Sequence, residues 1–194
     1  MKIVAITGSI GCGKTTLAHL VRDLGYTVYD ADGWVRRLYY QKDFIAAVGR
    51  QFPEVIENGK VNKRRLRDIV FSDNSRLKVL EALVHPFLKQ MFKKLKKRNA
   101  GYDDLFFIDV ALLFEMGWDK FCDYVIVADV AYELQKQRVM KRDNISSEDF
   151  EKINKVQMSN EAKKQFADAV INTDKPLNLL KASLLCVISE IEDC

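Results

Sequence analysis

Apolar and polar residues follow two different patterns along this chain. Short runs rich in Val, Ile, Phe and Tyr predict buried strands, because β-branched and aromatic side chains favour a packed, pleated backbone. Longer stretches mix apolar and charged residues at helical spacing, which indicates amphipathic helices. The expected strands are residues 2–7, 26–29, 105–110, 124–128 and 167–172. The expected helices are residues 16–24, 38–49, 63–71, 75–97, 133–142 and 177–191.

The order of these elements predicts the fold class. Strands that alternate with helices favour a parallel sheet, so we expect an α/β fold with a five-stranded parallel sheet and helices on both faces. The helical stretch between the second and third strands is too long for one crossover helix, which indicates an insertion over the ligand-binding edge. Within it, Asn58-Gly59 is a turn signal, and His85-Pro86 is expected to interrupt the last helix or to begin a new one.

Residues 8–15 (GSIGCGKT) match the phosphate-binding loop pattern G-x-x-x-x-G-K-[ST] at every fixed position. The loop lies between an expected strand and an expected helix. Its backbone N–H groups and the positive end of the helix dipole therefore converge on one point, as a polyphosphate site requires. We expect Lys14 to reach the β- and γ-phosphates of a nucleotide and the Thr15 hydroxyl to bind Mg²⁺.

Carboxylates follow two of the expected strands. Asp30 and Asp32 come after the second strand, and Asp109 lies at the end of the third. Ligands of open α/β sheets bind at the carboxyl ends of the strands, so these side chains are candidates for a general base and for Mg²⁺ ligation. One of the first two alternatively caps the helix expected to begin near residue 33.

Two arginines mark the expected helix 133–142. Arg138 and Arg142 are four residues apart and therefore lie on one helix face. Together with the charged segment that follows, they are typical of a lid over a transferring phosphoryl group. A solvent-exposed charged hairpin fits the same spacing equally well.

Composition narrows the class of protein and its location. A net charge of +4 suits an anionic small-molecule substrate and is much lower than the positive charge typical of nucleic-acid-binding proteins. The basic run 93–98 is therefore interpreted as the solvated end of a helix. The four cysteines show neither disulfide nor zinc spacing, and no apolar run is long enough to cross a bilayer. We therefore expect a cytoplasmic protein with reduced thiols that binds neither nucleic acid nor membrane, as a monomer or a small homo-oligomer. Because Cys12 lies near a helix N-terminus, we expect the pKa of its thiol to be lowered. We also expect bound ATP to protect this thiol from alkylation.

Several segments taken together resemble the dephospho-coenzyme A kinase family. They are TGSIGCGKTT (7–16), YDAD (29–32), NGKVNKRRLRDIVF (58–71), LVHPF (83–87), ALLFE (111–115), CDYVIV (122–127), QKQRVMKRD (135–143) and ADAVIN (167–172). They follow the order found in the family and span nearly the whole chain. The sequence departs from the family where Ser9 replaces Gly, Cys12 replaces Ser, Ala111 replaces Pro, and Asn62-Lys63 replaces an Asp-Arg pair.

The resemblance implies a P-loop kinase fold and a defined reaction. We expect one domain with a nucleotide-binding core (1–32, 100–135 and 160–194), a helical substrate-binding insertion (33–99) and a helical lid (136–159). The implied reaction is phosphorylation by ATP of the ribose 3′-hydroxyl of dephospho-coenzyme A, the last step of coenzyme A synthesis.

The resemblance also implies roles for individual residues. Asp32 is the implied general base, while Lys14, Arg138 and Arg142 stabilise the transferring group. Mg²⁺ is implied at Thr15, and the place of Asp109 at the end of the third strand makes it the second expected ligand. The residues implied to bind ATP are Gly11, Cys12, Gly13, Lys14, Thr15 and Thr16. The residues implied to bind the acceptor are Asp32, His85, Leu112 and Glu115.

Three other functions share part of the sequence pattern. Another small-molecule kinase, acting on a nucleoside monophosphate or a sugar acid, would share the loop, the early Asp and the lid arginines, but it does not predict the His-Pro and Leu-Leu-Phe-Glu segments. A GTP-binding switch needs an N-K-x-D segment, and residues 154–157 (NKVQ) lack the Asp. A nucleic-acid-binding protein that uses the lysine run predicts an affinity that falls steeply with salt.

Overall fold

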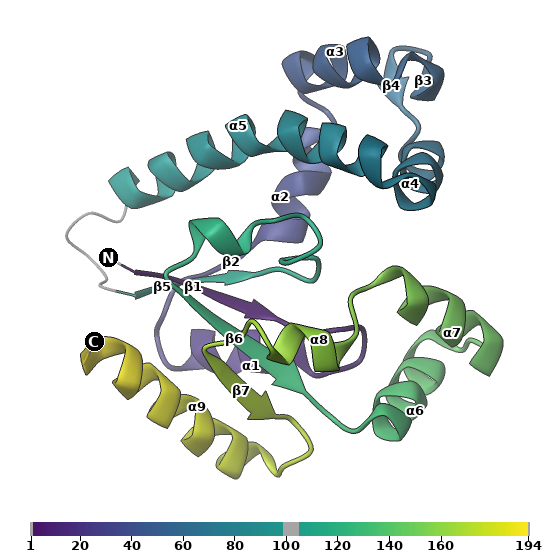
Figure 1. Cartoon of the computed structure of the whole chain (residues 1–194). Coiled ribbons are helices and arrows are strands. Elements are labelled where there is room, and N and C mark those ends of the chain that lie inside the picture. Colours follow the sequence, from purple (N-terminus) through teal and green to yellow (C-terminus); the bar gives the residue numbers. More distant parts are fainter. Residues whose placement is uncertain (1, 99–104, 194) are drawn as a thin grey trace. The chain divides into compact units, whose positions relative to one another are not determined.

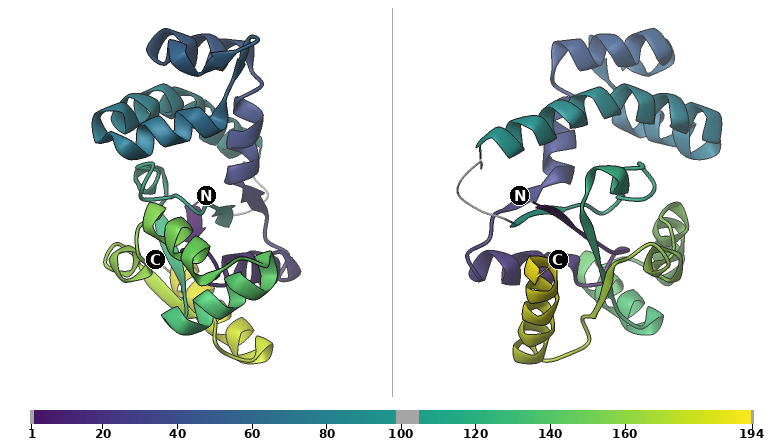
Figure 2. Two further views of the ribbon diagram at one scale, coloured as in Figure 1. Left: turned by 90° about the vertical axis from the view of Figure 1, so that its right-hand side faces the viewer. Right: turned by 60° about the vertical axis from the view of Figure 1, so that its left-hand side comes forward.

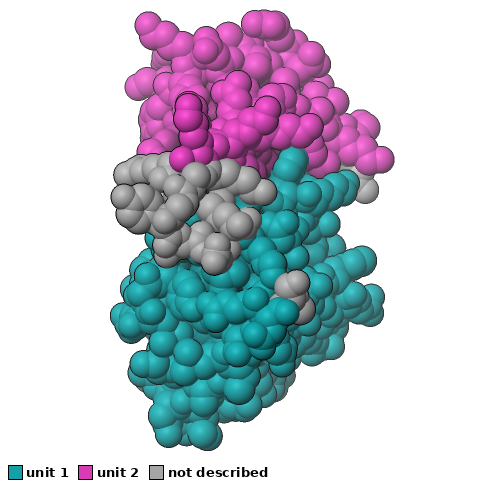
Figure 3. All heavy atoms as spheres, turned by 90° about the vertical axis from the view of Figure 1, so that its left-hand side faces the viewer, with its two compact units in different colours: residues 1–31, 100–194 teal, residues 32–99 magenta. Residues whose placement is uncertain are grey.

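The computed structural model describes residues 2–98 and 105–193, which form two compact units. The core unit consists of Met1–Ala31 and Ala100–Cys194, and the helical unit consists of Asp32–Asn99 (Figure 3). No helix in the described ranges is both long enough and apolar enough to cross a membrane. Each unit is described below by itself.

The core unit is built on a five-stranded parallel sheet. Its strands lie in the order β2-β5-β1-β6-β7, with β1 at the centre (Figure 1). Val4 of β1 pairs with Phe107 of β5 on one side and with Tyr124 of β6 on the other. The expected α/β fold with a five-stranded parallel sheet is therefore confirmed. The strands are β1 (Lys2–Thr7), β2 (Val28–Asp30), β5 (Leu105–Asp109), β6 (Tyr124–Asp129) and β7 (Ala169–Asn172).

Helices of the core unit pack on this sheet and extend from it. Helices α1 and α9 share a buried cluster with the strands, in which Leu17 and Leu184 are fully buried. Helices α6 and α7 contact each other and form a helical hairpin (Figures 1 and 2). The helices are α1 (Lys14–Asp23), α6 (Tyr132–Asp143), α7 (Ser147–Val156), α8 (Asn160–Lys164) and α9 (Leu177–Asp193), with a 3₁₀ turn, η2 (Asp119–Phe121), before β6.

The helical unit consists of helices and one small hairpin. Phe44 lies at its centre, where its ring packs edge-on against Tyr39 and Phe87. The turn expected at Asn58-Gly59 is the tip of a hairpin, and both residues have positive φ, as a tight two-residue hairpin turn requires. The elements are α2 (Ala31–Leu38), α3 (Lys42–Gln51), η1 (Pro53–Val55), β3 (Ile56–Glu57), β4 (Lys60–Val61), α4 (Lys63–Ser72) and α5 (Asn74–Arg98).

Two expectations for this unit were wrong. The helix expected over 38–49 begins only at Lys42, as α3, because the chain turns after Leu38, which is the last residue of the separate helix α2. The interruption expected at His85-Pro86 is absent, because α5 runs through Pro86 as one helix. Pro86 itself is exposed, whereas Val84 and Leu88 on either side are buried. Packing of these flanking turns keeps the helix continuous although proline removes one backbone donor.

The basic run at the end of α5 lies as expected. Lys93, Lys94 and Lys97 occupy exposed positions in the last turns of this helix. Cations near a helix C-terminus also interact favourably with the helix dipole.

Candidate functional site

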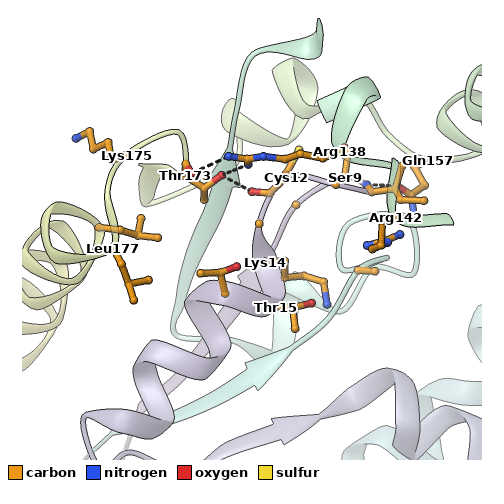
Figure 4. A pocket seen from close by; sticks show the side chains of 17 residues that line it. Ser9, Cys12, Lys14, Thr15, Arg138, Arg142, Gln157, Thr173, Lys175 and Leu177 are labelled. Carbon is orange, nitrogen blue, oxygen red and sulfur yellow. Dashed lines mark hydrogen bonds between the residues drawn. The ribbon is translucent and has the colours of Figure 1, made fainter. Parts of the chain in front are cut away.

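A cavity of about 700 Å³ opens at the end of β1 in the core unit (Figure 4). Its floor is the glycine-rich loop, and its walls come from α6, from the segment after α7, and from the segment after β7. The lining residues are Gly8, Ser9, Ile10, Gly11, Cys12, Gly13, Lys14, Thr15, Thr16, Ala111, Arg138, Arg142, Gln157, Thr173, Lys175, Leu177 and Leu180.

Two glycines are required where the loop touches its neighbours. Gly11 has φ +79, and a Cβ there would lie 2.5 Å from Val139 Cγ2. Gly13 has φ +83, and a Cβ there would lie 2.7 Å from Thr173 Oγ1. The loop thus lies directly on α6 and on the segment after β7, in a left-handed backbone conformation that other residues adopt at a cost.

Helix α1 begins at this loop without a side-chain cap. Gly13 is the N-cap residue in a left-handed conformation, and its carbonyl accepts from Leu17 N–H at 3.1 Å. The first-turn N–H groups of a helix need acceptors, and an anion is the natural one where the N-cap has no side-chain oxygen. Thr15 and Thr16 lie in this first turn, exposed to the cavity.

Side chains from outside the loop fix its backbone polar groups. Gln157 Oε1 accepts from Ile10 N–H at 2.8 Å, and Gln135 donates to the Ile10 carbonyl at 2.8 Å. The Thr173 hydroxyl donates to the Cys12 carbonyl, also at 2.8 Å. These bonds leave the loop with one defined shape, so its remaining N–H groups are oriented in advance of any ligand.

Lys14 and Asp109 form a partly buried ion pair at the carboxyl ends of the central strands. The register of the sheet sets Asp30 of β2 opposite Asp109 of β5, so the two carboxylates expected at this edge lie on neighbouring strands. Among the described residues, no three His, Cys, Asp or Glu side chains gather as a metal site. A cation here would therefore depend on few protein ligands and on oxygen atoms of a substrate.

The two arginines of α6 have different partners. Arg138 donates to the Thr173 hydroxyl and to the Thr173 carbonyl, each at 3.2 Å, and lies 3.8 Å from the Asp174 carboxylate (Figure 4). Arg142 pairs with Asp143 through two bonds of 2.8 and 2.7 Å. This pairing raises the pKa of Arg142 and lowers the pKa of Asp143. Both arginines line the cavity, and the lid role of this hairpin stays a prediction.

The lowered thiol pKa expected for Cys12 was wrong. Its side chain is fully buried, and burial raises the pKa of the thiol to about 12, with the Asp129 carboxylate adding to the shift. The loop bends so that the backbone of Cys12 faces the cavity while its sulfur packs into the core of the sheet. Desolvation therefore outweighs the helix dipole. Cys12, Cys122 and Cys186 are free thiols, and Cys194 lies outside the described residues.

The segment after β5 has partners within the core unit. Glu115 forms an ion pair with Lys163, with 3.0 Å between Oε1 and Nζ, and it also accepts from Met158 N–H at 2.8 Å. Leu112, half-buried in the same turn, has a carbonyl that accepts from Met116 N–H at 3.1 Å. The assignment of Glu115 and Leu112 to the acceptor site stays a prediction.

Two further residues with expected roles belong to the helical unit. Asp32 lies in the first turn of α2, directly after the end of β2, and His85 lies in α5. Asp30 immediately precedes α2. Their roles also stay predictions.

Sequence reasoning missed residues that hold the site together. Thr173 and Gln157 bind the loop backbone, and Lys163 is the fully buried partner of Glu115. One signal was available for Thr173, because it follows β7 and polar residues after a parallel strand lie at the ligand-binding edge. No local pattern marks Lys163, because the adjacent Lys164 is the same residue type and is not buried.

Proteins of known family match nearly the full length of the chain. The family model for dephospho-CoA kinase matches residues 2–178. The dephospho-CoA kinase of Bartonella henselae is 38% identical over 193 residues, which cover 98% of each chain. A crystal structure from Thermus thermophilus has a TM-score of 0.82 at 35% identity and covers 97% of both chains. The dephospho-CoA kinase structure from Campylobacter jejuni has a TM-score of 0.65 at 25% identity and covers 97% of this chain and 96% of that chain. The chain therefore belongs to the dephospho-CoA kinase family of P-loop kinases, which use ATP to phosphorylate dephospho-CoA in the final step of coenzyme A biosynthesis.

Proposed function

We propose that the cavity of the core unit binds the triphosphate of ATP and that the residues around it transfer the γ-phosphoryl group to the ribose 3′-hydroxyl of dephospho-coenzyme A. One observation carries this proposal. The uncapped N-terminus of α1 opens into a cavity that is also lined by Lys14, Arg138 and Arg142, so helix dipole and three cations converge on one volume.

Lys14 is the proposed ligand of the β- and γ-phosphates. Its ammonium group is paired with Asp109, and this pairing holds it at the cavity floor before the nucleotide arrives. A cation that is already oriented spends little free energy on reorganisation when negative charge shifts between phosphate oxygens during transfer.

Arg138 and Arg142 are the proposed lid cations. The bonds from Arg138 to Thr173 fix its guanidinium over the loop, so it suits the binding of ATP in the ground state. Arg142 is exposed and has a local partner in Asp143, so it is able to exchange that carboxylate for phosphate oxygens. Guanidinium groups bind phosphate in bidentate fashion, which suits both roles.

The residues present fit a magnesium ion that is held mainly by phosphate. The Thr15 hydroxyl lines the cavity, and the Asp109 carboxylate is paired with Lys14, which lines it too. These two groups are the proposed oxygen ligands, and Mg²⁺ commonly uses one or two protein ligands together with substrate phosphates. When bound, the ion would neutralise charge on the β- and γ-phosphates.

Asp32 is the proposed general base, and the helical unit is proposed to bind the acceptor through residues that include His85. A ribose hydroxyl is a weak nucleophile, and a carboxylate is able to accept its proton as the bond to phosphorus forms. The helical unit contains many more Lys and Arg residues than Asp and Glu residues, which suits an acceptor that carries a diphosphate. Leu112, in the turn after β5, is proposed to contact the same acceptor.

A coupled assay of ADP release tests the reaction. Mg-ATP is supplied with dephospho-coenzyme A, adenosine, AMP, shikimate, gluconate or no acceptor. We expect ADP only with dephospho-coenzyme A, with coenzyme A as the product. ADP formed with another acceptor would refute the proposed substrate, and hydrolysis without an acceptor would favour a nucleotide switch.

The base is tested by Asp32→Asn, with Asp43→Asn as a matched control on the exposed first turn of α3. We expect Asp32→Asn to bind ATP normally and to lose about 10²-fold or more in kcat, which is the usual contribution of a positioned base. The control is expected to keep the parental rate. Activity of the Asp32 variant within about threefold of the parent would remove it from this role.

We further propose a cytoplasmic enzyme that acts as a monomer or a small homo-oligomer, without a nucleic-acid or membrane partner. The free thiols Cys12, Cys122 and Cys186 support a reducing compartment. Size-exclusion chromatography with light scattering measures the oligomeric state directly.

A further inference from the structure

Residues 157–160, which we call the anchor segment, run from the end of α7 to the first residue of α8 and are bonded to the phosphate loop. Gln157 accepts from Ile10 N–H at 2.8 Å. The Ser9 hydroxyl donates to the Met158 carbonyl, and Ser9 N–H donates to Asn160 Oδ1, each at 3.1 Å. The anchor segment therefore holds the first half of the loop in addition to the loop's own turn, in which Cys12 N–H donates to the Ser9 carbonyl at 3.1 Å.

The other side of the anchor segment is held by an ion pair. Met158 N–H donates to Glu115 Oε1 at 2.8 Å, and Glu115 is bound by Lys163 Nζ at 3.0 Å. Lys163 also donates to the carbonyl of Ala111 at 2.7 Å. A continuous chain of hydrogen bonds thus leads from Lys163 through Glu115 and Met158 to the loop residue Ser9.

Because the Glu115–Lys163 pair is buried, loss of either partner is costly. The Lys163 side chain is fully buried, and the Glu115 side chain is 12% exposed. Burial lowers the pKa of Lys163, and the Glu115 carboxylate opposes that shift. A buried charge that loses its partner is strongly destabilising, whereas replacement of both charges by neutral groups is often tolerated. The pair therefore holds a defined arrangement although it adds little net stability.

We propose that Glu115 and Lys163 are positioning residues for ATP, whose buried ion pair fixes the anchor segment and, through it, the phosphate loop. This inference rests on the proposed function, because it assigns Glu115 to the nucleotide side of the reaction. Both carboxylate oxygens of Glu115 already have partners inside the core unit, so a direct contact with dephospho-coenzyme A would require breaking these bonds.

Three variants test the proposal. Glu115→Gln keeps an oxygen that accepts from Met158 N–H but removes the charge, Lys163→Met keeps the length of the side chain but removes the charge, and the third variant combines both changes. Glu161→Gln is the matched control, because Glu161 forms an exposed ion pair with Lys164 on the same helix as Lys163. The readouts are the Kd of Mg-ATP by calorimetry without acceptor, the KM of dephospho-coenzyme A, and the thermal unfolding midpoint.

We expect each single variant to weaken ATP binding about tenfold with a KM for dephospho-coenzyme A within about threefold of the parent. The double variant is expected to recover part of the thermal unfolding midpoint that the single variants lose, because no uncompensated charge remains. It is still expected to bind ATP about tenfold more weakly than the parent, because the ion pair that fixes the anchor segment is missing in all three variants. The control is expected to match the parent in all three readouts.

Two results would overturn the proposal. The first is a Glu115→Gln variant with parental ATP binding and a KM for dephospho-coenzyme A raised tenfold, which would return Glu115 to the acceptor site. The second is a folded double variant that binds ATP as tightly as the parent, which would show that the ion pair is not needed to position the phosphate loop. If a single variant fails to fold, the double variant alone decides, by its Kd for Mg-ATP and its KM for dephospho-coenzyme A. A parent enzyme that binds ATP but does not phosphorylate dephospho-coenzyme A would refute the proposed function, and ATP binding by the variants would still decide this inference.

Discussion

Replacing Gly11 by Ala tests how tightly the phosphate loop is packed against α6. The added Cβ would lie 2.5 Å from Val139 Cγ2 and 2.9 Å from the Gln135 carbonyl oxygen, at a backbone φ of +79. The left-handed backbone costs about 1–2 kcal/mol for a residue with a Cβ. Overpacking against a buried neighbour costs about 1–3 kcal/mol more. We therefore expect the free energy of unfolding to fall by about 2–5 kcal/mol.

Gly25→Ala is the matched control for backbone strain. Gly25 also has a left-handed backbone, with φ +94, and it lies at the end of α1 in the same unit, but a Cβ there would meet no atom within 4 Å. The control is therefore expected to lose only the strain of about 1–2 kcal/mol. The difference between the two variants measures the contact with α6.

Urea unfolding measures both variants, because a change of midpoint at constant slope reports a change of stability. At a slope of about 2 kcal/mol/M, the contact is expected to separate the midpoints by about 0.5–1.5 M. Val139→Ala combined with Gly11→Ala is expected to be less unstable than the sum of the two single changes, because it removes the methyl group that the new Cβ would meet. Equal midpoints for Gly11→Ala and Gly25→Ala would refute the close packing of loop and helix.

Two further predictions concern the same cavity. Thr173→Val keeps the shape of the side chain but removes the hydroxyl that donates to the Cys12 carbonyl and accepts from Arg138. We therefore expect the free energy of unfolding to fall by about 1–3 kcal/mol and calorimetry to show weaker ATP binding. Ser189→Ala, on the exposed face of α9, is the control that is expected to be unaffected. Because burial raises the pKa of Cys12 from 9.0 to about 12, its thiolate fraction at pH 8 falls from about 10% to about 0.01%, and mass spectrometry should find exposed Cys186 alkylated and Cys12 unmodified with or without Mg-ATP. The raised pKa also contributes stability that is fully present below pH 9 and is lost as the pH rises toward 12. Cys12→Ala should therefore reduce the loss of stability between pH 9 and 12. Rapid labelling of native Cys12, or the same loss of stability at alkaline pH in Cys12→Ala and the parent, would contradict the burial of this thiol.

The phosphate loop and the alternation of strands and helices were determined by the sequence alone. Residues 8–15 combine a fixed pattern with a preceding apolar run and a following helix, and each of these signals is local in the chain. The turn at Asn58-Gly59 was predictable for the same reason, because both residue types tolerate positive φ. Local conformational preferences act over a few residues, so they can be recognised in one sequence without knowledge of its packing.

Packing decided the properties that depend on distant neighbours. Proximity to a helix N-terminus suggested a reactive Cys12, but the core of the sheet surrounds its sulfur and raises the pKa of the thiol. Pro86 suggested an interrupted helix, but buried residues in the adjacent turns of α5 keep it continuous. In both cases contacts with residues distant in the sequence, through burial of the thiol or packing of the helix, outweigh a local preference of about one to three kcal/mol.

The partners of the site were decided entirely by the tertiary structure. Thr173 meets Cys12 across 161 residues of sequence, and Lys163 meets Glu115 across 48. Nothing in the local pattern around Lys163 distinguishes it from the exposed lysines of the same chain. The parallel sheet brings the ends of β1, β5, β6 and β7 to one edge, and only this arrangement determines which side chains hold the phosphate loop in its shape.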